Sequence, residues 1–394
     1  MMRVCHVIDS MHRKMGGPSF SVAELTEGLS GQGVATSLFT IDYKFLGELL
    51  VPEGVDMHCF SGNFLTKKLA GIQPCLQSSL QKVTEKDCQL VHNHGLWLFS
   101  NLYARQAAVK NKLPLVISPR GMLEAWSMKR SQFKKKLVWS LWERENLKHA
   151  AAFHATSEQE ADSIRQLGFK QPIAVIPNSI HLPSLAAVPS REVLETDFPH
   201  LKGKKWFLFM SRIHPKKGLE ELLHAWKALE KKFPQWHLII AGADVTGYTE
   251  DLNIFIEQHS LRERVTFTGM LTGSKKEAAL GNSAIFVLPT HSENFGRVIA
   301  ESLSYAVPAI TTKGAPWEDL EKYQCGWWIE DDRQALQIAL LKALLTSPEE
   351  LKRMGQRGRG LVKEKYGGKD CARQMMSVYQ WLIDGGREPS CVKL

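Results

Sequence analysis

The sequence predicts an α/β protein with two doubly wound, Rossmann-like parallel-sheet domains. Its 394 residues are too many for one typical domain. Apolar segments of strand length alternate with segments of helical periodicity, which is typical of parallel sheets covered by helices. This alternation is interrupted at residues 177–205, a stretch rich in proline, serine, leucine and lysine, and then starts afresh. We therefore expect a linker in that stretch.

The first half is predicted to begin with a strand at residues 3–8, followed by a loop that contains Gly16 and Gly17. Ser157 and Glu160 form a capping box, which predicts that a helix begins there. Apolar spacing predicts strands at 34–39, 90–92, 115–118, 151–155 and 173–176, and helices at 19–31, 100–110 and 157–167. We place the first domain at residues 1–190.

The second half shows the same order of elements without a repeat of sequence. Strands are predicted at 206–210, 236–241, 265–268, 284–288 and 309–311, with helices at 219–231, 248–259, 274–280 and 332–345. We place the second domain at residues 200–368. A last amphipathic helix is expected at residues 371–383, where apolar residues recur at helical spacing.

The composition narrows the class of protein. A hydrophobic content of 44% and a charged content of 23% are ordinary for a soluble globular protein. The seven cysteines are scattered without a C-x-x-C pair, which argues against a zinc site and a disulfide framework. No signal-peptide pattern and no apolar run of about 18 residues occurs, so we expect a cytoplasmic protein. The net charge of +9 suits an anionic substrate or membrane surface, although a solvated basic surface explains it too.

Several common nucleotide and metal motifs do not occur in the sequence. No G-x-G-x-x-G follows the first strand, which disfavours a dinucleotide-dependent dehydrogenase. No G-x-x-x-x-G-K-[ST] loop is found, which argues against a P-loop nucleotidase. No Asp-x-Asp pair is present that would hold a diphosphate-bound metal. We expect no metal, no other cofactor and no nucleic-acid partner.

The most informative stretch is residues 289–301, which read PTHSENFGRVIAE. It places Glu293 in a loop after a buried-looking strand, and Glu301 about two turns into a helix that begins near Phe295. Open parallel sheets bind ligands at the carboxyl ends of their strands. Such a site can present backbone N–H groups to a phosphate and carboxylates to sugar hydroxyls.

A second candidate is the loop at residues 211–218, which follows the strand at 206–210. Arg212 and Lys217 can aim a guanidinium fork and an ammonium group at one diphosphate. A solvated basic turn is the alternative explanation for this loop.

Together, Arg212, Lys217, Glu293 and Glu301 in this order resemble glycosyltransferase family four, whose members have the GT-B fold of two Rossmann-like domains facing across a cleft. The resemblance covers most of the chain and is strongest at residues 206–312. It implies a retaining glycosyltransferase that moves a sugar from a nucleotide-diphosphate sugar to a glycan or lipid-linked acceptor, in cell-envelope or exopolysaccharide biosynthesis. It also implies that a last helix, at about 371–386, completes the first domain.

The resemblance assigns roles to individual residues. Arg212 and Lys217 would bind the donor diphosphate, Glu293 the donor sugar and Glu301 the ribose. The remaining donor-binding positions that it implies are Gly16, Gly17, Met270, Leu271, Asn294, Phe295 and Gly296. His94 matches a family histidine close to the reacting sugar, so the catalytic set is Glu293, His94, Arg212 and Lys217.

Each of these roles has a structural alternative. Gly16 and Gly17 also fit a simple tight turn, and Glu301 also fits a solvent-facing helix position. His94 is expected in a loop that lines the site, whereas His92 is expected inside the strand with its ring turned inward. Arg120, which follows the strand at 115–118, fits an acceptor contact or a structural salt bridge.

Residues 129–146 combine a lysine cluster with Leu137, Trp139, Leu141 and Trp142. Such a stretch, from Lys129 to Trp142, can lie on an anionic membrane surface and approach a lipid-linked acceptor. The alternative is that the tryptophans are core residues and the lysines are solvated. We favour the core for Trp142 and membrane contact for the lysine cluster.

The sequence departs from the common family pattern at Arg297, where a smaller or apolar residue is more usual, and at residues 313–317, which replace a frequent double glycine. These changes bear on the donor sugar pocket. A nucleotide-sugar epimerase with the GT-B fold and a non-catalytic nucleotide-sugar-binding subunit are the alternative functions. The nucleotide, the sugar and the acceptor do not follow from the sequence.

Overall fold

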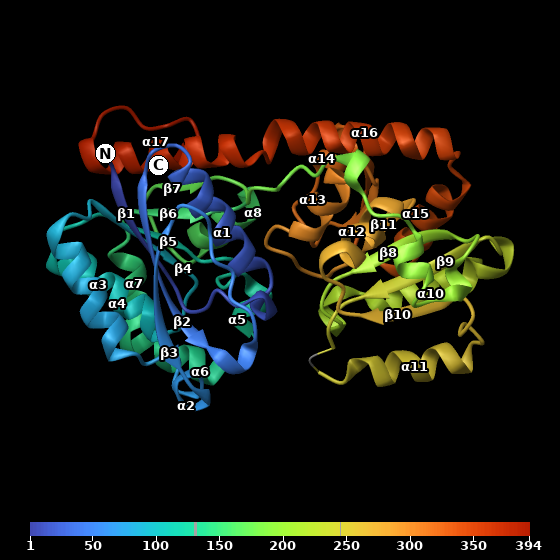
Figure 1. Ribbon diagram of the computed structural model, residues 1–394, viewed down its shortest axis with the longest axis horizontal. Coiled ribbons are helices and arrows are strands. Elements are labelled where there is room, and N and C mark those ends of the chain that lie inside the picture. The colour runs from blue at the N-terminus through green and yellow to red at the C-terminus, as the bar shows by residue number, and fades with distance from the viewer. Residues whose placement is uncertain (130–131, 245) are drawn as a thin grey trace. The chain divides into compact units, whose positions relative to one another are not determined.

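The computed structural model describes residues 1–129, 132–244 and 246–394 and divides into two compact units (Figure 1). The first unit contains Met1–Ser179 and Gly368–Leu394, and the second contains Ile180–Gly367. Each unit is built around its own sheet of parallel strands with helices packed against it. The predicted fold class is therefore confirmed.

In the first unit, β1 (Arg3–Ile8) pairs in parallel with β2 (Ala35–Tyr43) and with β4 (Leu90–His94). The strand order is β14-β7-β6-β5-β4-β1-β2-β3. The other strands are β3 (Asp56–Gly62), β5 (Leu115–Ser118), β6 (Ala152–Ala155), β7 (Ile173–Val175) and β14 (Val392–Lys393), of which β14 runs antiparallel to β7. Strands β2 and β3 follow on one side of β1, and β4 to β7 follow on the other side, so the switch point of this sheet lies between β1 and β4.

The helices of the first unit cover its sheet. They are α1 (Gly17–Ser30), α2 (Phe64–Lys68), α3 (Pro74–Lys86), α4 (Phe99–Lys110), α5 (Ala125–Lys129), α6 (Gln132–Val138), a π-helix at Trp139–Glu143, α7 (Arg144–Lys148), α8 (Glu158–Gln166) and α17 (Gly368–Asp384). Short 3₁₀ turns lie at Arg13–Met15 and Lys44–Leu46. Leu25 and Leu29 of α1 share one hydrophobic cluster with Met375, Val378 and Tyr379 of α17, so this last helix packs into the first unit.

In the second unit, β8 (Lys205–Met210) pairs in parallel with β9 (Trp236–Ala241) and β11 (Ile285–Leu288). The order is β10-β9-β8-β11-β12-β13, with β10 (Val265–Gly269), β12 (Ala309–Thr312) and β13 (Gly326–Ile329). The helices are α9 (Glu192–Glu195), α10 (Leu219–Leu229), α11 (Tyr248–Gln258), α12 (Gly273–Asn282), α13 (Arg297–Ser304), α14 (Asp319–Lys322), α15 (Arg333–Leu345) and α16 (Pro348–Lys365). Short 3₁₀ turns lie at Leu185–Ala187, Pro199–Leu201, Pro215–Lys217 and Glu230–Lys232. The sheet is again doubly wound, with its switch point between β8 and β11.

The expected linker at residues 177–205 is wrong in part, because most of this segment packs into the second unit. Leu194 and Leu201 are fully buried and belong to that unit's hydrophobic core. The guanidinium of Arg191 lies 4.2 Å from the centre of the Trp206 ring. The proline and serine content of the segment suggested a linker, but Leu194 and Leu201 pack into the core.

Helix α16 (Pro348–Lys365) was not predicted, because its sequence contains Gly355, Gly358 and Gly360, and glycines usually mark turns. A Cβ atom at Gly355 would lie 1.7 Å from the carbonyl oxygen of Ala306. A Cβ atom at Gly358 would lie 2.6 Å from Leu303. These glycines let α16 pack closely against the end of α13.

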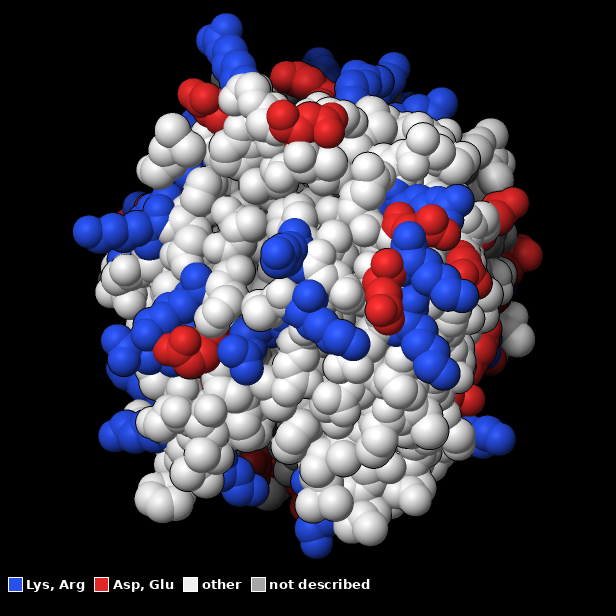
Figure 2. Space-filling view, turned by 90° about the vertical axis from the view of Figure 1, so that its left-hand side faces the viewer, with Lys and Arg blue, Asp and Glu red and all other residues white. Residues whose placement is uncertain are grey.

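Charge is dispersed over the surface that Figure 2 displays, where basic side chains lie among acidic and uncharged ones. The net charge of +9 therefore does not by itself define a binding surface on that face. None of the helices in the described part of the chain is long and apolar enough to span a membrane.

Candidate functional site

Three loops at the carboxyl edge of the second sheet are tied together through their backbones. They are residues 211–218 after β8, residues 289–296 after β11 and residues 313–318 after β12. The N–H of His291 donates to the carbonyl of Lys216 at 2.9 Å, and the N–H of Glu293 donates to the carbonyl of Gly314 at 2.7 Å. These bonds fix the loop that carries Glu293 against both of its neighbours.

Glycine is required where these loops touch. Gly218 has a φ of +68°, and a Cβ atom there would lie 1.9 Å from the carbonyl oxygen of Pro289. A Cβ atom at Gly314 would lie 2.4 Å from the carbonyl oxygen of Thr290. No side chain fits at either position without moving the backbone, so the two glycines set how close the loops come.

This packing brings Lys217 and Glu293 together in an ion pair between the ammonium Nζ and the carboxylate Oε1. Lys217 is 6% exposed, so its charge is largely removed from water. Arg212, on the same loop as Lys217, is exposed. The structure thus joins two of the predicted donor-binding residues directly and places the third at the surface of the same loop.

Glu301 lies on α13 between two positive charges. Its Oε2 is 2.8 Å from Nζ of Lys276, and its Oε1 accepts from Nε of Arg297 at 3.0 Å. Burial raises the pKa of Glu301, but the charges of Lys276 and Arg297 outweigh burial and hold that pKa below its ordinary value. Glu301 is therefore an ionised carboxylate, and the solvent-facing alternative is wrong, since its side chain is only 16% exposed.

The sequence Asn294–Phe295–Gly296 forms the turn before α13, which begins at Arg297 rather than near Phe295 as expected. Phe295 packs against Trp317 and Tyr366 and is buried, and its carbonyl accepts from the Trp317 indole N–H at 2.5 Å. Its side chain thus holds the turn in the core, and only its backbone is available to a ligand. Gly296 caps α13 with a φ of +73°.

The other predicted donor-binding residues lie at loop surfaces. Met270, which follows β10, is 51% exposed, and Leu271 is partly buried. In the first unit Gly16 caps α1 with a φ of +78°, and Gly17 is the first residue of that helix. No atom lies within 4 Å of a Cβ atom built at Gly16 or Gly17, so the conformation of Gly16, rather than crowding, favours glycine.

His94 does not line a loop, as was expected, but is the last residue of β4 and is 3% exposed. It lies two residues from His92 in the same strand, so both rings point to the same face of the sheet. Arg120 Nη2 donates to His94 Nδ1 at 3.0 Å, so the proton of the neutral ring is on Nε2, which lies 2.9 Å from His6 Nδ1. Both ring nitrogens of His94 are therefore engaged within the first unit.

His92 belongs to a chain of buried hydrogen bonds. Tyr379 donates to His92 Nδ1 at 2.5 Å, and His92 Nε2 lies 2.7 Å from Ser118 Oγ. Ser118 Oγ lies 2.8 Å from His154 Nδ1, and His154 Nε2 lies 2.9 Å from the carbonyl of Ile176. Since that carbonyl can only accept, every proton in the chain has one position. The inward position expected for His92 is what the structure has.

The histidine cluster consists of neutral imidazoles. Burial and the nearby charge of Arg120 lower the pKa of His6 to about 3 and that of His154 to about 3. His6, His92 and His94 each offer a ligand atom within 4.8 Å of the others. A cation there would meet the positive charge of Arg120, and it would have to displace hydrogen bonds on two of the three rings. The donor set therefore fits a hydrogen-bonded network better than a metal site.

Arg120 adopts a left-handed conformation, with a φ of +57°. Its Nη1 donates to Ser21 Oγ at 2.9 Å and to Asn178 Oδ1 at 2.8 Å, in addition to the bond to His94. These partners make it a residue that joins α1, β4 and the segment after β7. These three partners are neutral, so they are not those of the salt bridge that was the alternative, and the acceptor contact stays a prediction.

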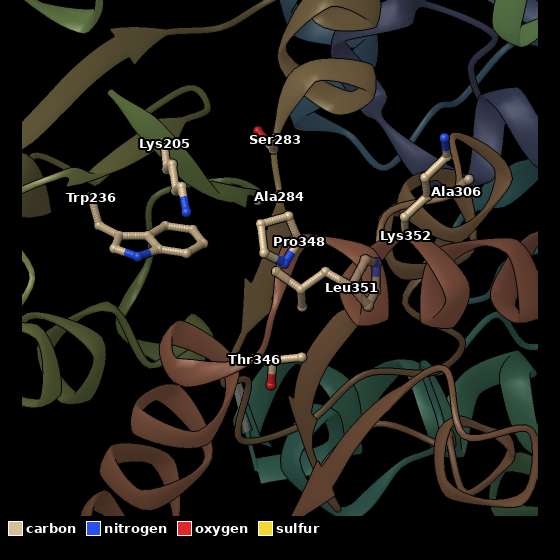
Figure 3. A pocket seen from close by; sticks show the side chains of 10 residues that line it. Lys205, Trp236, Ser283, Ala284, Ala306, Thr346, Pro348, Leu351 and Lys352 are labelled. Atoms are coloured by element: carbon tan, nitrogen blue, oxygen red, sulfur yellow. The ribbon is translucent and has the colours of Figure 1, made fainter. Parts of the chain in front are cut away.

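The cavity shown in Figure 3 is not the predicted site. It has a volume of about 300 Å³ and lies where the strands of the second sheet begin, at the edge opposite to the three loops. Its lining is mostly apolar, and Lys205 lies over the Trp236 ring with its Nζ 5.6 Å from the ring centre. The residues around it are Lys205, Trp236, Ser283, Ala284, Ala306, Pro308, Thr346, Pro348, Leu351 and Lys352.

Sequence analysis missed Lys276 as a site residue and noted Arg297 only as a departure from a pattern. Lys276 lies in a lysine-rich helix start, Gly273-Ser274-Lys275-Lys276, where nothing distinguishes one lysine from the next. Arg297 is four residues before Glu301, a spacing that indicates an ion pair on one helix face. That spacing was the one available signal.

Family comparison identifies the class of the chain. Residues 16–179 match the glycosyl transferase 4-like domain, and residues 190–361 match the glycosyl transferases group 1. The chain belongs to the group 1 glycosyltransferases with the GT-B fold, so the resemblance drawn from its motifs is confirmed.

Individual relatives agree with this class. A GDP-mannose:cellobiosyl-diphosphopolyprenol alpha-mannosyltransferase of Xanthomonas oryzae pv. oryzae is 24% identical over 80% of each chain. A 2-deoxystreptamine N-acetyl-D-glucosaminyltransferase of Niallia circulans is 26% identical over 77% of this chain and 81% of that one. The crystal structure of Anabaena HepE in complex with UDP and glucose has a TM-score of 0.74 at 17% identity, with 95% and 98% of the two chains covered. That last similarity supports the fold alone.

The close approach at Gly218 predicts an unequal effect of two otherwise similar substitutions. Gly218→Ala and Gly247→Ala both place a side chain at positive φ before a helix, but only Gly218 faces a backbone atom. Gly247→Ala should cost about 1–2 kcal/mol. Gly218→Ala should cost more than about 3 kcal/mol, because the loops must also separate. Urea unfolding measures both, and equal losses would contradict the proposed packing.

Proposed function

We propose that this chain is a retaining glycosyltransferase that transfers a sugar from a nucleotide-diphosphate sugar to a glycan or lipid-linked acceptor. The observation that carries the proposal is the pairing of Lys217 with Glu293 at the carboxyl edge of the second sheet. A cation for a diphosphate and a carboxylate for sugar hydroxyls are thereby held side by side. The edge itself is the place where parallel α/β sheets bind ligands.

The chemistry would rest on stabilising the leaving diphosphate. As the glycosidic bond breaks, the sugar gains oxocarbenium character and negative charge grows on the phosphate oxygens. Lys217, Arg212 and the positive end of the α13 helix dipole can oppose that charge. A buried ammonium such as that of Lys217 acts strongly, because little water screens it.

Retention of configuration is supported by the way in which the two glutamates are bound. The carboxylates of Glu293 and Glu301 are each bound to cations, which suits them to hold hydroxyls rather than to attack carbon. Both nitrogens of His94 are engaged, so we assign it a positioning rather than a proton-transfer role. The acceptor proton would then pass to the leaving phosphate on the same face of the sugar. No step in this scheme calls for a metal ion.

The acceptor class is proposed from the relatives. One of them is a mannosyltransferase that acts on cellobiosyl-diphosphopolyprenol, and WaaG, a structure with a TM-score of 0.66 at 14% identity, is described as involved in lipopolysaccharide biosynthesis. A role in cell-envelope or exopolysaccharide biosynthesis is consistent with both. GDP-mannose and a UDP-sugar are the donors that these comparisons suggest for testing.

A lipid-linked acceptor would bring the chain to a membrane surface, and α6 with the π-helix that follows it offers a face for such contact. Phe133, Leu137 and Leu141 are 85%, 55% and 62% exposed and are spaced four residues apart. Lys134 and Lys136 are exposed beside them. The neighbouring Trp142 instead packs its ring 5.1 Å from Phe99, as favoured from the sequence. Helix α6 lies at one end of the first unit (Figure 1). The predicted Arg130 and Ser131 of this stretch fall outside the described residues.

Donor binding predicts that the cognate donor among UDP-, GDP- and ADP-sugars stabilises the protein against thermal unfolding, by about 2.7 kcal/mol at about 100 times its Kd.

The donor assignment also predicts an asymmetry between the two glutamates. Glu293→Ala should then chiefly lower kcat, and Glu301→Ala should chiefly raise the donor KM. Lys217→Met should lower kcat by on the order of 10²–10³. Asp87→Ala, which removes an exposed partner of Arg3 away from the three loops, is the control.

The reverse asymmetry would overturn the roles of Glu293 and Glu301. No thermal response to any of the nucleotide sugars would count against donor binding altogether. Complete loss of turnover in EDTA that Mg²⁺ restores would contradict the metal-independent scheme.

Membrane association predicts that the chain co-sediments with vesicles of phosphatidylglycerol and not with vesicles of phosphatidylcholine. The double variant Phe133→Ser/Leu137→Ser should lose most of this binding, because it removes the exposed apolar side chains of α6. Ile254→Ser, a change at an exposed apolar position of the second unit, should not affect it. Equal binding to both vesicles, or no binding, would contradict the proposal.

A further inference from the structure

The cavity in Figure 3 lies where four strands of the second sheet begin. Lys205 is the first residue of β8, and Trp236 is the first residue of β9. Ala284 and Pro308 come directly before β11 and β12, and Leu351 adds a side chain from α16. All of these residues belong to the second unit, so the cavity is a feature of that unit alone.

The apolar part of the lining is largely buried. Trp236 is 1% exposed, Leu351 is 6% exposed, and Pro308 is buried as well. The cavity volume of about 300 Å³ is at the lower end of the range for small-molecule sites, which are mostly apolar with a few polar groups. A ligand that fits here therefore gains affinity from an apolar body, by about fourfold for each CH₂ group that is buried.

The polar part of the lining carries positive charge. Lys205 and Lys352 are exposed and come from different elements, β8 and α16 (Figure 3). Lys205 Nζ lies 5.6 Å from the centre of the Trp236 ring. Among the described residues, neither lysine has an acidic partner, and no aspartate or glutamate lines the cavity. Unpaired ammonium groups beside an apolar surface favour an anionic ligand over a cationic one.

The donors around the cavity suit a carboxylate better than a phosphate. Phosphate sites usually offer an arginine fork or several backbone N–H groups, and no arginine is found in the described lining. Pro348 has no N–H, and the Ser347 hydroxyl already accepts from the N–H of Glu350 at 3.2 Å, so the start of α16 offers few donors. A lysine ammonium is a point charge that pairs with a carboxylate without a fixed geometry.

We propose that this cavity is a ligand site for a small monocarboxylate with an apolar body, such as an acyl chain of medium length. The carboxylate pairs with Lys205 or Lys352 at the rim, and the apolar body packs against Trp236 and Leu351. The inference does not rest on the proposed donor function, because the cavity and the three loops lie at opposite edges of the sheet.

A packing defect beneath solvated lysines would have the same residues but different behaviour. It would take up apolar molecules whatever their charge, and substitution of the lysines would not change their affinity. A carboxylate site should instead prefer an anion over an alcohol or an ammonium of the same chain length. It should lose that preference when the lysines are replaced.

The experiment is an NMR titration of the full chain with butanoate, hexanoate and octanoate. The indole N–H resonance of Trp236, identified as the one that Trp236→Phe lacks, reports binding at the cavity itself. It should shift with octanoate, and the Kd should fall by about fourfold for each further buried CH₂ group. Octylammonium should not shift it. Lys205→Met, a change at an exposed side chain over the ring, provides a second identification of the resonance.

The double variant Lys205→Met/Lys352→Met removes both positive charges from the lining. It should weaken octanoate by about threefold or more and bring its affinity close to that of octan-1-ol. Lys202→Met is the matched control, because Lys202 is an exposed lysine three residues before Lys205 that does not line the cavity. The affinity for octanoate should be unchanged in this control.

Three results would overturn the inference. Equal affinities for octanoate and octylammonium would mean that the cavity takes up apolar molecules without regard to charge. An unchanged affinity for octanoate in the double variant would mean that the lysines are only solvated. An indole resonance of Trp236 that octanoate does not shift would mean that the cavity binds no such ligand.

Discussion

The candidate site depends on one constraint, the contact between backbones of the three loops at the carboxyl edge of the second sheet. Gly218 and Gly314 allow carbonyl oxygens of Pro289 and Thr290 to approach where any side chain would collide. Once these loops are in contact, the positions of Lys217 and Glu293 follow from the positions of their backbones. Strand order and loop packing therefore bring Lys217 and Glu293 together, and no long-range electrostatic attraction is needed to explain their pairing.

The two units differ in the charge state of their buried polar groups. In the second unit the buried charges are paired, as in Lys217 with Glu293 and in Glu301 with Lys276 and Arg297. In the first unit the histidines are neutral, since burial lowers the pKa of His6 and of His154 to about 3. Paired charges remain available to a charged ligand that can compete for them, whereas a chain of neutral hydrogen bonds mainly fixes the positions of strands. This contrast agrees with a donor site in the second unit.

Much of this arrangement could be predicted from the sequence, and the failures have physical reasons. The alternation of strands and helices decides which loops share an edge of the sheet, so the sequence alone places Glu293 and Lys217 at the same edge. His94 was misplaced because the end of β4 cannot be located to two residues from propensity. The glycines of α16 and the prolines of residues 180–204 indicate only local backbone preferences. Close packing at Gly355 and burial of Leu194 override those preferences, so the sequence did not predict either segment correctly. Lys276, one of the two partners of Glu301, lies on another helix, so no local sequence pattern indicates it.

The most direct test of the central claim is the anomeric configuration of the first product. Proton NMR can follow transfer from an α-configured nucleotide sugar, or its slow hydrolysis if no acceptor is supplied, before the free sugar equilibrates. A donor clamp built from Lys217 and Glu293, with departure and attack on one face, predicts that the α-anomer is released first. Release of the β-anomer first would mean attack from the opposite face by an activated acceptor, and it would contradict the account.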